Sequence, residues 1–102
     1  MKGMVITMEI ELAHVVVSLN GRDKGKRFLV VGIEEGFSLL ADGKGRKLEK
    51  PKRKKNKHVK LERILEGQVA EKLLSGQKVT NNELRRAMAE YAVVDGEIRG
   101  GM

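Results

Sequence analysis

Glycine-containing turns divide the first 61 residues into short apolar runs, and this punctuation limits what the chain can fold into. The β-branched run at 15–19 ends at Asn20-Gly21, a dipeptide typical of tight hairpins. Later runs end at Gly36 and Gly43. Short runs at near-regular spacing favour a small barrel over a parallel sheet. The predicted strands cover residues 15–19, 28–33, 37–41, 46–50 and 58–61. Pro51 falls in a connection, where it removes no ladder hydrogen bond.

After residue 61 the apolar spacing becomes helical. Leu65, Val69 and Leu73 recur at every fourth residue, and Gly76 is placed to end that helix. The stripe of the next helix matches the template of an amphipathic helix. It consists of Leu84, Ala87, Met88, Tyr91 and Ala92.

The start of the second helix carries a strong local signal. Thr80 and Glu83 form a Thr-x-x-Glu capping box, and Val79 and Leu84 stand where a hydrophobic staple would close. The chain is therefore predicted to be mostly β with a C-terminal α part. The expected units are an N-terminal tail at 1–11, a barrel at 12–61 with a basic arm at 44–60, a helical hairpin at 62–94 and a flexible tail at 95–102. Met4 and Met8 are alternative initiators, so residues 1–7 are expected to be a tail or a misassigned start.

The predicted strands do not alternate cleanly between apolar and polar residues, so both faces of the sheet need cover. One face is expected to hold Val15, Val17 and Leu19 in the barrel interior. The opposite face would hold Val16, Leu29 and Val31. We expect the helical hairpin to cover this outer face. The alternative is that the hairpin docks a protein partner.

Positive charge is concentrated in residues 44–60. The segment holds ten basic residues and one acid, Glu49, for a balance of +9, whereas the whole chain carries +7 and the remainder sums to −2. Like charges at this density repel one another unless an anion joins them. A phosphate backbone is such an anion, because each neutralised phosphate releases condensed counterions. A solvated loop and a nuclear targeting signal are the competing interpretations.

The turn at 20–26 and the residue after it carry a second, smaller basic cluster. Its basic residues are Arg22, Lys24, Lys26 and Arg27, and its one acid is Asp23. We interpret the cations as phosphate contacts and Asp23 as a structural turn cap. The alternative is a plain hairpin loop in which Gly21 and Gly25 supply positive φ.

The sequence lacks the residues that several classes of function require. There is no cysteine, which excludes disulfides, zinc ribbons and thiol nucleophiles. His14 and His58 have no companions as metal ligands, and no catalytic constellation or nucleotide-binding loop is present. No apolar run approaches the roughly 18 residues of a membrane span, and residues 1–7 are too short for a secretory signal. We expect a non-catalytic cytoplasmic protein without cofactor, metal, membrane or small-molecule partner.

The low aromatic content indicates which kind of nucleic acid the basic residues would bind. With no Trp, one Tyr and two Phe, the chain lacks the platforms on which single-strand binders stack bases. Phe28 and Phe37 are expected in the core, and Tyr91 in the helix stripe. Recognition would then rest on phosphate and 2′-hydroxyl contacts with folded RNA.

Residues 15–26, Val-Val-Val-Ser-Leu-Asn-Gly-Arg-Asp-Lys-Gly-Lys, resemble a KOW motif, which is a strand, a basic glycine turn and a second strand. The turn is similar to that of the archaeal and eukaryotic large-subunit ribosomal protein "fourteen-e" family, and closer to the small bacterial KOW-domain RNA-binding proteins related to it. Residues 40–44, Arg46-Lys47, Lys57-His58 and residues 74–85 are similar to the same bacterial group. Gly25 matches the most constant glycine of the motif. Phe28 replaces a second glycine, which favours the ribosomal-protein subtype over the transcription-factor type.

The resemblance implies an SH3-like barrel that binds RNA on a ribosome or its precursor. If the helical hairpin docks a protein partner, a neighbouring ribosomal protein or an assembly factor is the expected one. We therefore predict non-catalytic binding of structured RNA, above all ribosomal RNA, with an arm at 50–57 that orders on binding. The alternatives are a protein-interaction module for an acidic partner or a transcription or assembly factor, and non-specific DNA binding. The predicted contact residues are Arg22, Lys24, Gly25, Lys26, Arg27, Arg46, Lys47, Lys50, Lys52, Arg53, Lys54, Lys55 and Lys57.

Overall fold

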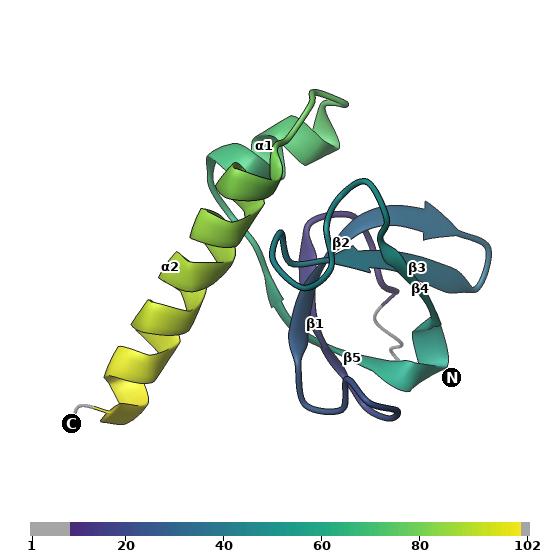
Figure 1. The fold of residues 1–102 in the computed structure, drawn as a ribbon, viewed down its shortest axis with the longest axis horizontal. Coiled ribbons are helices and arrows are strands. Elements are labelled where there is room, and N and C mark those ends of the chain that lie inside the picture. The colour runs from purple at the N-terminus through teal and green to yellow at the C-terminus, as the bar shows by residue number, and fades with distance from the viewer. Residues whose placement is uncertain (1–8, 101–102) are drawn as a thin grey trace, which may run out of the picture.

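The computed structural model describes residues 9–100, which form a five-stranded sheet and two helices. The elements are β1 His14–Ser18, β2 Arg27–Glu34, β3 Phe37–Ala41, β4 Lys52–Lys55, the 3-10 turn η1 Asn56–His58, β5 Val59–Ile64, α1 Gln68–Leu74 and α2 Asn81–Gly100. Both helices lie on one side of a curled sheet (Figure 1). The predicted class, mostly β with a C-terminal α part, is confirmed. Within residues 9–100, no helix has the combination of length and apolar character needed to cross a membrane.

The sheet is antiparallel throughout, in the order β4-β3-β2-β1-β5. The last strand returns to pair with the first, while β4 and β5 remain as edges. The sheet is therefore open, and the described residues lack the pairing that would close it into the predicted barrel. Between the two edge strands the chain turns through η1 instead of continuing as one paired strand.

Four of the five predicted strands are confirmed to within a few residues, and the fourth is wrong. Residues 46–50 form turns, and the strand begins after Pro51. β4 is made of Lys52, Arg53, Lys54 and Lys55, which the sequence placed in an arm that orders on binding. Four consecutive cations do not indicate a strand, because they repel one another and the groups that pair with them lie elsewhere in the chain.

Strand register decides which side chains share a face. Val15 lies opposite Leu29, and Val16 lies opposite Phe28. Cross-strand partners point to the same side of a sheet, so Val15 faces outward with Leu29, and Val16 faces inward. The expected assignment of Val15 and Val16 to their faces is therefore reversed. Leu19, expected inside, is 45% exposed.

Two apolar clusters occupy the two faces. The inner cluster consists of Val16, Phe28, Val30, Leu40 and Val59, with Ile10 packed against it. The outer cluster joins Val15, Leu29 and Ala41 of the sheet to Leu84 of α2. Leu65, Val69, Leu73, Val79 and Met88 pack against this outer cluster. The expected cover of the outer face by the helical part is thus confirmed, with Leu84 and Met88 of the predicted stripe in this cluster. The side chains of Tyr91 and Ala92 lie outside the part of the chain whose side chains the structure describes.

Local signals at the helix ends are confirmed. The Thr80 hydroxyl accepts a hydrogen bond from the Glu83 amide at 3.1 Å, and the Glu83 carboxylate accepts one from the Thr80 amide at 3.0 Å. At the end of α1, the Gly76 amide donates to the Leu73 carbonyl, and the next amide donates to Lys72. This pair of bonds is the Schellman pattern.

The unit boundaries differ in two places. β5 extends to Ile64, so the helical part begins later than residue 62. α2 continues through residues 95–100, which the sequence assigned to a tail. Gly96 costs a helix only about 1 kcal/mol relative to alanine, which is too little to end it. Residues 1–8 and 101–102 of the predicted tails lie outside the described residues.

The loop between β3 and β4 packs closely against the start of α2. Gly43 has a φ of +80°, and a Cβ placed there would lie 2.5 Å from the Asn81 carbonyl oxygen and 2.8 Å from the Arg85 amide nitrogen. The Asn81 side chain continues the contact, because its Oδ1 accepts from the Leu48 amide and its Nδ2 donates to Glu49, both at 2.7 Å. The position of α2 therefore determines the shape of this loop.

This packing predicts a large effect of a single methyl group. Gly43→Ala is expected to lower the free energy of unfolding by roughly 2 to 5 kcal/mol, from the left-handed backbone and the overpacking together. Gly45→Ala is the matched control, since the same loop leaves open space around Gly45. It should change stability by less than about 0.5 kcal/mol. Denaturant unfolding of both variants checks this, and equal stabilities would contradict the close approach.

Candidate functional site

The smaller basic cluster, at residues 20–27, lies mostly in the loop between β1 and β2, and backbone hydrogen bonds close this loop. The Gly25 amide donates to the Ser18 carbonyl at 2.8 Å, and the Ser18 amide donates to the Lys26 carbonyl at 3.0 Å. These bonds close the loop at the end of β1 and turn its tip toward solvent. Arg22, Lys24, Gly25 and Lys26 are all exposed.

Arg27 differs from its neighbours in the loop. Its Nε and Nη2 donate to the two carboxylate oxygens of Glu62 on β5, at 2.7 and 3.0 Å. A bidentate pair of this kind uses the planar fork of the guanidinium. Arg27, predicted to contact phosphate, is therefore engaged by a carboxylate within the fold.

The larger basic segment, residues 44–60, contacts the β1–β2 loop through β4. The Lys52 ammonium lies 2.9 Å from Oδ2 of Asp23, whose side chain is only 15% exposed. Lys54 is buried, and its ammonium donates to the Asn20 carbonyl at 3.1 Å. Two cations predicted to contact phosphate thus join β4 to the β1–β2 loop. Asp23 is structural as expected, although its side chain pairs with a lysine instead of capping the turn.

Arg53 is also engaged within the fold. Its Nε lies 2.6 Å from a carboxylate oxygen of Glu34, and its guanidinium lies 3.6 Å from the centre of the Phe37 ring. Such a cation–π contact contributes about 0.5–1 kcal/mol at exposed sites. Because Phe28 is buried and Arg53 covers Phe37, neither phenylalanine offers an open ring for stacking bases.

Asp23 lies at the meeting point of the two basic segments. The hydrogen-bonding ammonium of Lys52 is the main cause that lowers the pKa of Asp23 below its ordinary value of 3.8, and partial burial opposes it. Lys26 of the first loop and Arg46 of the β3–β4 loop lower the pKa further. One partly buried carboxylate therefore interacts with cations from three parts of the chain.

The β3–β4 loop is shaped by its own first residue. Oδ1 of Asp42 accepts hydrogen bonds from the amides of Lys44 and Arg46, both at 2.9 Å. This Asx-type turn and the contacts of Asn81 together give the loop its shape. The sequence did not predict that Asn81 bonds to this loop, because a residue beside a capping box is expected to face solvent.

Several predicted contact residues remain available to a ligand. Those in the two segments that are exposed and have no ion pair within residues 9–90 are Arg22, Lys24, Lys26, Lys47, Lys50, Lys55 and Lys57, together with Lys44 and Lys60. Arg46 is half-buried beside Asp23. Lys57 lies apart from the loops, because it lines a cavity that also includes Glu34 and Glu35.

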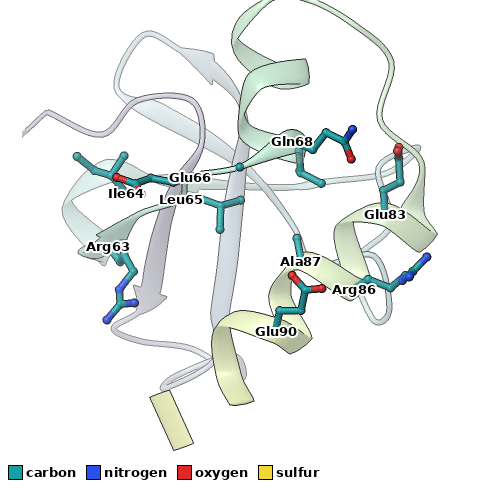
Figure 2. Close-up of a pocket in the computed structure, with 11 residues that line it drawn as sticks. Arg63, Ile64, Leu65, Glu66, Gln68, Glu83, Arg86, Ala87 and Glu90 are labelled. Atoms are coloured by element: carbon teal, nitrogen blue, oxygen red, sulfur yellow. The ribbon is translucent and has the colours of Figure 1, made fainter. Parts of the chain in front are cut away.

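A different groove lies between the β5–α1 connection and α2. Its volume is about 660 Å³, and Leu65, Arg86, Ala87 and Glu90 are among the residues that line it (Figure 2). Acidic and basic side chains alternate around this groove, so its charge is mixed. It does not belong to the cationic surface.

Comparison with known protein families finds no family model that matches the chain, and no curated protein matches its sequence significantly. The site must therefore be interpreted from its own geometry. That geometry is a set of exposed cations on two loops whose shape is held by hydrogen bonds, with the Lys52–Asp23 ion pair connecting β4 to the β1–β2 loop.

The ion pair predicts a specific pH dependence of stability. A carboxylate with a lowered folded-state pKa contributes stability above its ordinary value of 3.8 and loses it as the pH falls through the lower folded value. Asp23→Asn is therefore expected to be less stable than the parent at pH 7 and to approach it at acidic pH. Thermal unfolding between neutral pH and pH 2 measures this difference.

Glu35→Gln is the control for the Asp23 variant. Glu35 is an exposed carboxylate without an ion pair among the residues described. Its replacement should leave the unfolding curve close to that of the parent at every pH. A stability difference for Asp23→Asn that stays constant down to pH 2 would contradict the role of the ion pair.

Proposed function

We propose that the protein binds structured RNA without catalysis, above all ribosomal RNA, and that the β1–β2 and β3–β4 loops contact its phosphates. The observation that carries this proposal is the convergence of the two basic segments around Asp23. Apart from Arg46, which is half-buried beside Asp23, the cations on both loops are exposed and have no ion pair among residues 9–90. Exposed cations held in place by the fold favour an extended polyanion, because such a ligand can neutralise several of them at once.

We favour folded RNA over single-stranded RNA because neither phenylalanine offers an open ring for stacking bases. A single-strand binder draws about 1–3 kcal/mol per base from aromatic stacking, and the two phenylalanines are buried or covered. A surface of cations suits phosphate and 2′-hydroxyl contacts along an RNA that is already folded. Base-specific recognition should be weak.

The finer description of the fold belongs to the same proposal. We infer that the open sheet is an SH3-like barrel of the KOW type, as the resemblance of residues 15–26 suggests. The return of β5 to β1 supports this inference. The bulge of β2 between Val30 and Gly32 also supports it, because bulges bend a strand and let a sheet curl. On this view the exposed loop at 19–26 is the KOW turn.

The proposal predicts strong salt dependence. If about six phosphates are neutralised, affinity should fall by roughly three decades between 50 and 200 mM salt. Filter binding of the whole protein to refolded total ribosomal RNA across this range measures the slope. The triple variant Lys44→Gln, Lys47→Gln, Lys50→Gln should reduce the slope by about 2 to 3, because three phosphate contacts are lost.

The matched control changes the same number of charges elsewhere. Lys57, Lys60 and Arg86 are exposed but line the two cavities away from the loops. Their replacement by glutamine should leave most of the salt slope in place. A flat salt response of the parent protein would overturn RNA binding in favour of a protein partner. Preference for duplex DNA over folded RNA in a competition assay would overturn the RNA assignment.

A further inference from the structure

The helical part contributes cations next to the β3–β4 loop. Arg85 is exposed on the first turns of α2, and a Cβ placed on Gly43 would lie 3.2 Å from its Cβ. Its guanidinium donates to Oδ1 of Asn82 at 2.7 Å, a neutral partner that leaves the positive charge uncompensated. One cation of the helix therefore stands directly beside the basic loop.

Lys78 adds a second cation from the connection between the helices. It is exposed, and together with Lys47 it lowers the pKa of Glu49, after the larger effects of the Asn81 amide and of a backbone hydrogen bond. Lys78 also lies three residues before Asn81, whose side chain donates to Glu49 at 2.7 Å, so the chain brings Lys78 close to the end of the β3–β4 loop. The basic surface of the loop continues across the chain onto the helical part.

Hydrogen bonds and close packing connect the β3–β4 loop to the start of α2. Asn81 bonds to the Leu48 amide and to Glu49, and Gly43 leaves no room for a side chain. The capping box of Thr80 and Glu83 in turn determines where α2 begins. The cations of the loop and those at the start of the helical part are thus positioned relative to one another by contacts within the fold.

We propose that Lys78 and Arg85 belong to the RNA-binding surface, so that the RNA backbone bound by the β3–β4 loop continues onto the start of the helical part. This inference rests on the proposed function. It gives the helices two roles, because their apolar stripe covers the sheet while their exposed edge extends the phosphate contacts. It also argues against the helical hairpin as a module reserved for a protein partner, since Leu84 and Met88 of its apolar stripe belong to the cluster on the outer face of the sheet.

Adjacent arginines provide a matched test. Successive residues of an α-helix point about 100° apart, so Arg85 faces the basic loop while Arg86 lines the mixed-charge groove of Figure 2. Arg85→Gln and Arg86→Gln make the same charge change on the same exposed turn. Both are surface substitutions, and their thermal unfolding should match the parent.

Filter binding of the full chain to refolded total ribosomal RNA compares the variants. Arg85→Gln and Lys78→Gln should each weaken binding on the order of fivefold at 0.1 M salt and lower the salt slope by about 1, whereas Arg86→Gln should leave the slope unchanged. Equal effects of Arg85→Gln and Arg86→Gln, whether both small or both large, would overturn the inference. RNA binding that depends on the loop lysines but not on Arg85 or Lys78 would overturn it and leave the proposed function standing. Failure of the parent protein to bind RNA would overturn both.

Discussion

The sheet has two apolar faces, and its own curl buries only one of them. Phe28, Val30 and Leu40 fill the inner face, whereas Val15 and Leu29 would remain in water without the helical part. Leu84 of α2 covers them, and burying a leucine side chain contributes about 1.5–3 kcal/mol. Because α2 must lie on this face, its first turns meet the β3–β4 loop and set the shape of that loop.

Many cations coexist in this small fold because some of them are paired within it. Those nearest the body of the sheet have partners: Lys52 pairs with Asp23, Arg53 with Glu34, and Lys54 with a backbone carbonyl. Exposed ion pairs contribute at most about 1 kcal/mol each, so they serve mainly to relieve repulsion and to orient the loops. The cations farther out on the loops are exposed, and they form no ion pair among residues 9–90. The basic residues thus separate into a supporting group and a group that is available to a ligand.

Local sequence signals predicted much of the fold and less of the site. The strand runs, the capping box at Thr80 and the end of α1 at Gly76 depend on neighbours in the chain, and the structure confirms them. The strand Lys52–Lys55 was missed because the groups that stabilise it are remote in sequence. Arg27 was assigned to phosphate for a similar reason, since Glu62 lies on a strand 35 residues away. Charge density indicates where cations are, but not which of them already have partners.

By itself, the sequence determined the element types, the turn positions and the concentration of positive charge, because each of these depends on side chains close together in the chain. The tertiary structure alone decided which face of the sheet each valine occupies, which lysines are paired and which loops meet. Register and helix packing cause these outcomes, and both depend on contacts between residues distant in sequence. The convergence of the β1–β2 loop, the β3–β4 loop and the start of α2 is one such outcome, since no local pattern places Asp23 beside Lys52 or Gly43 beside Arg85.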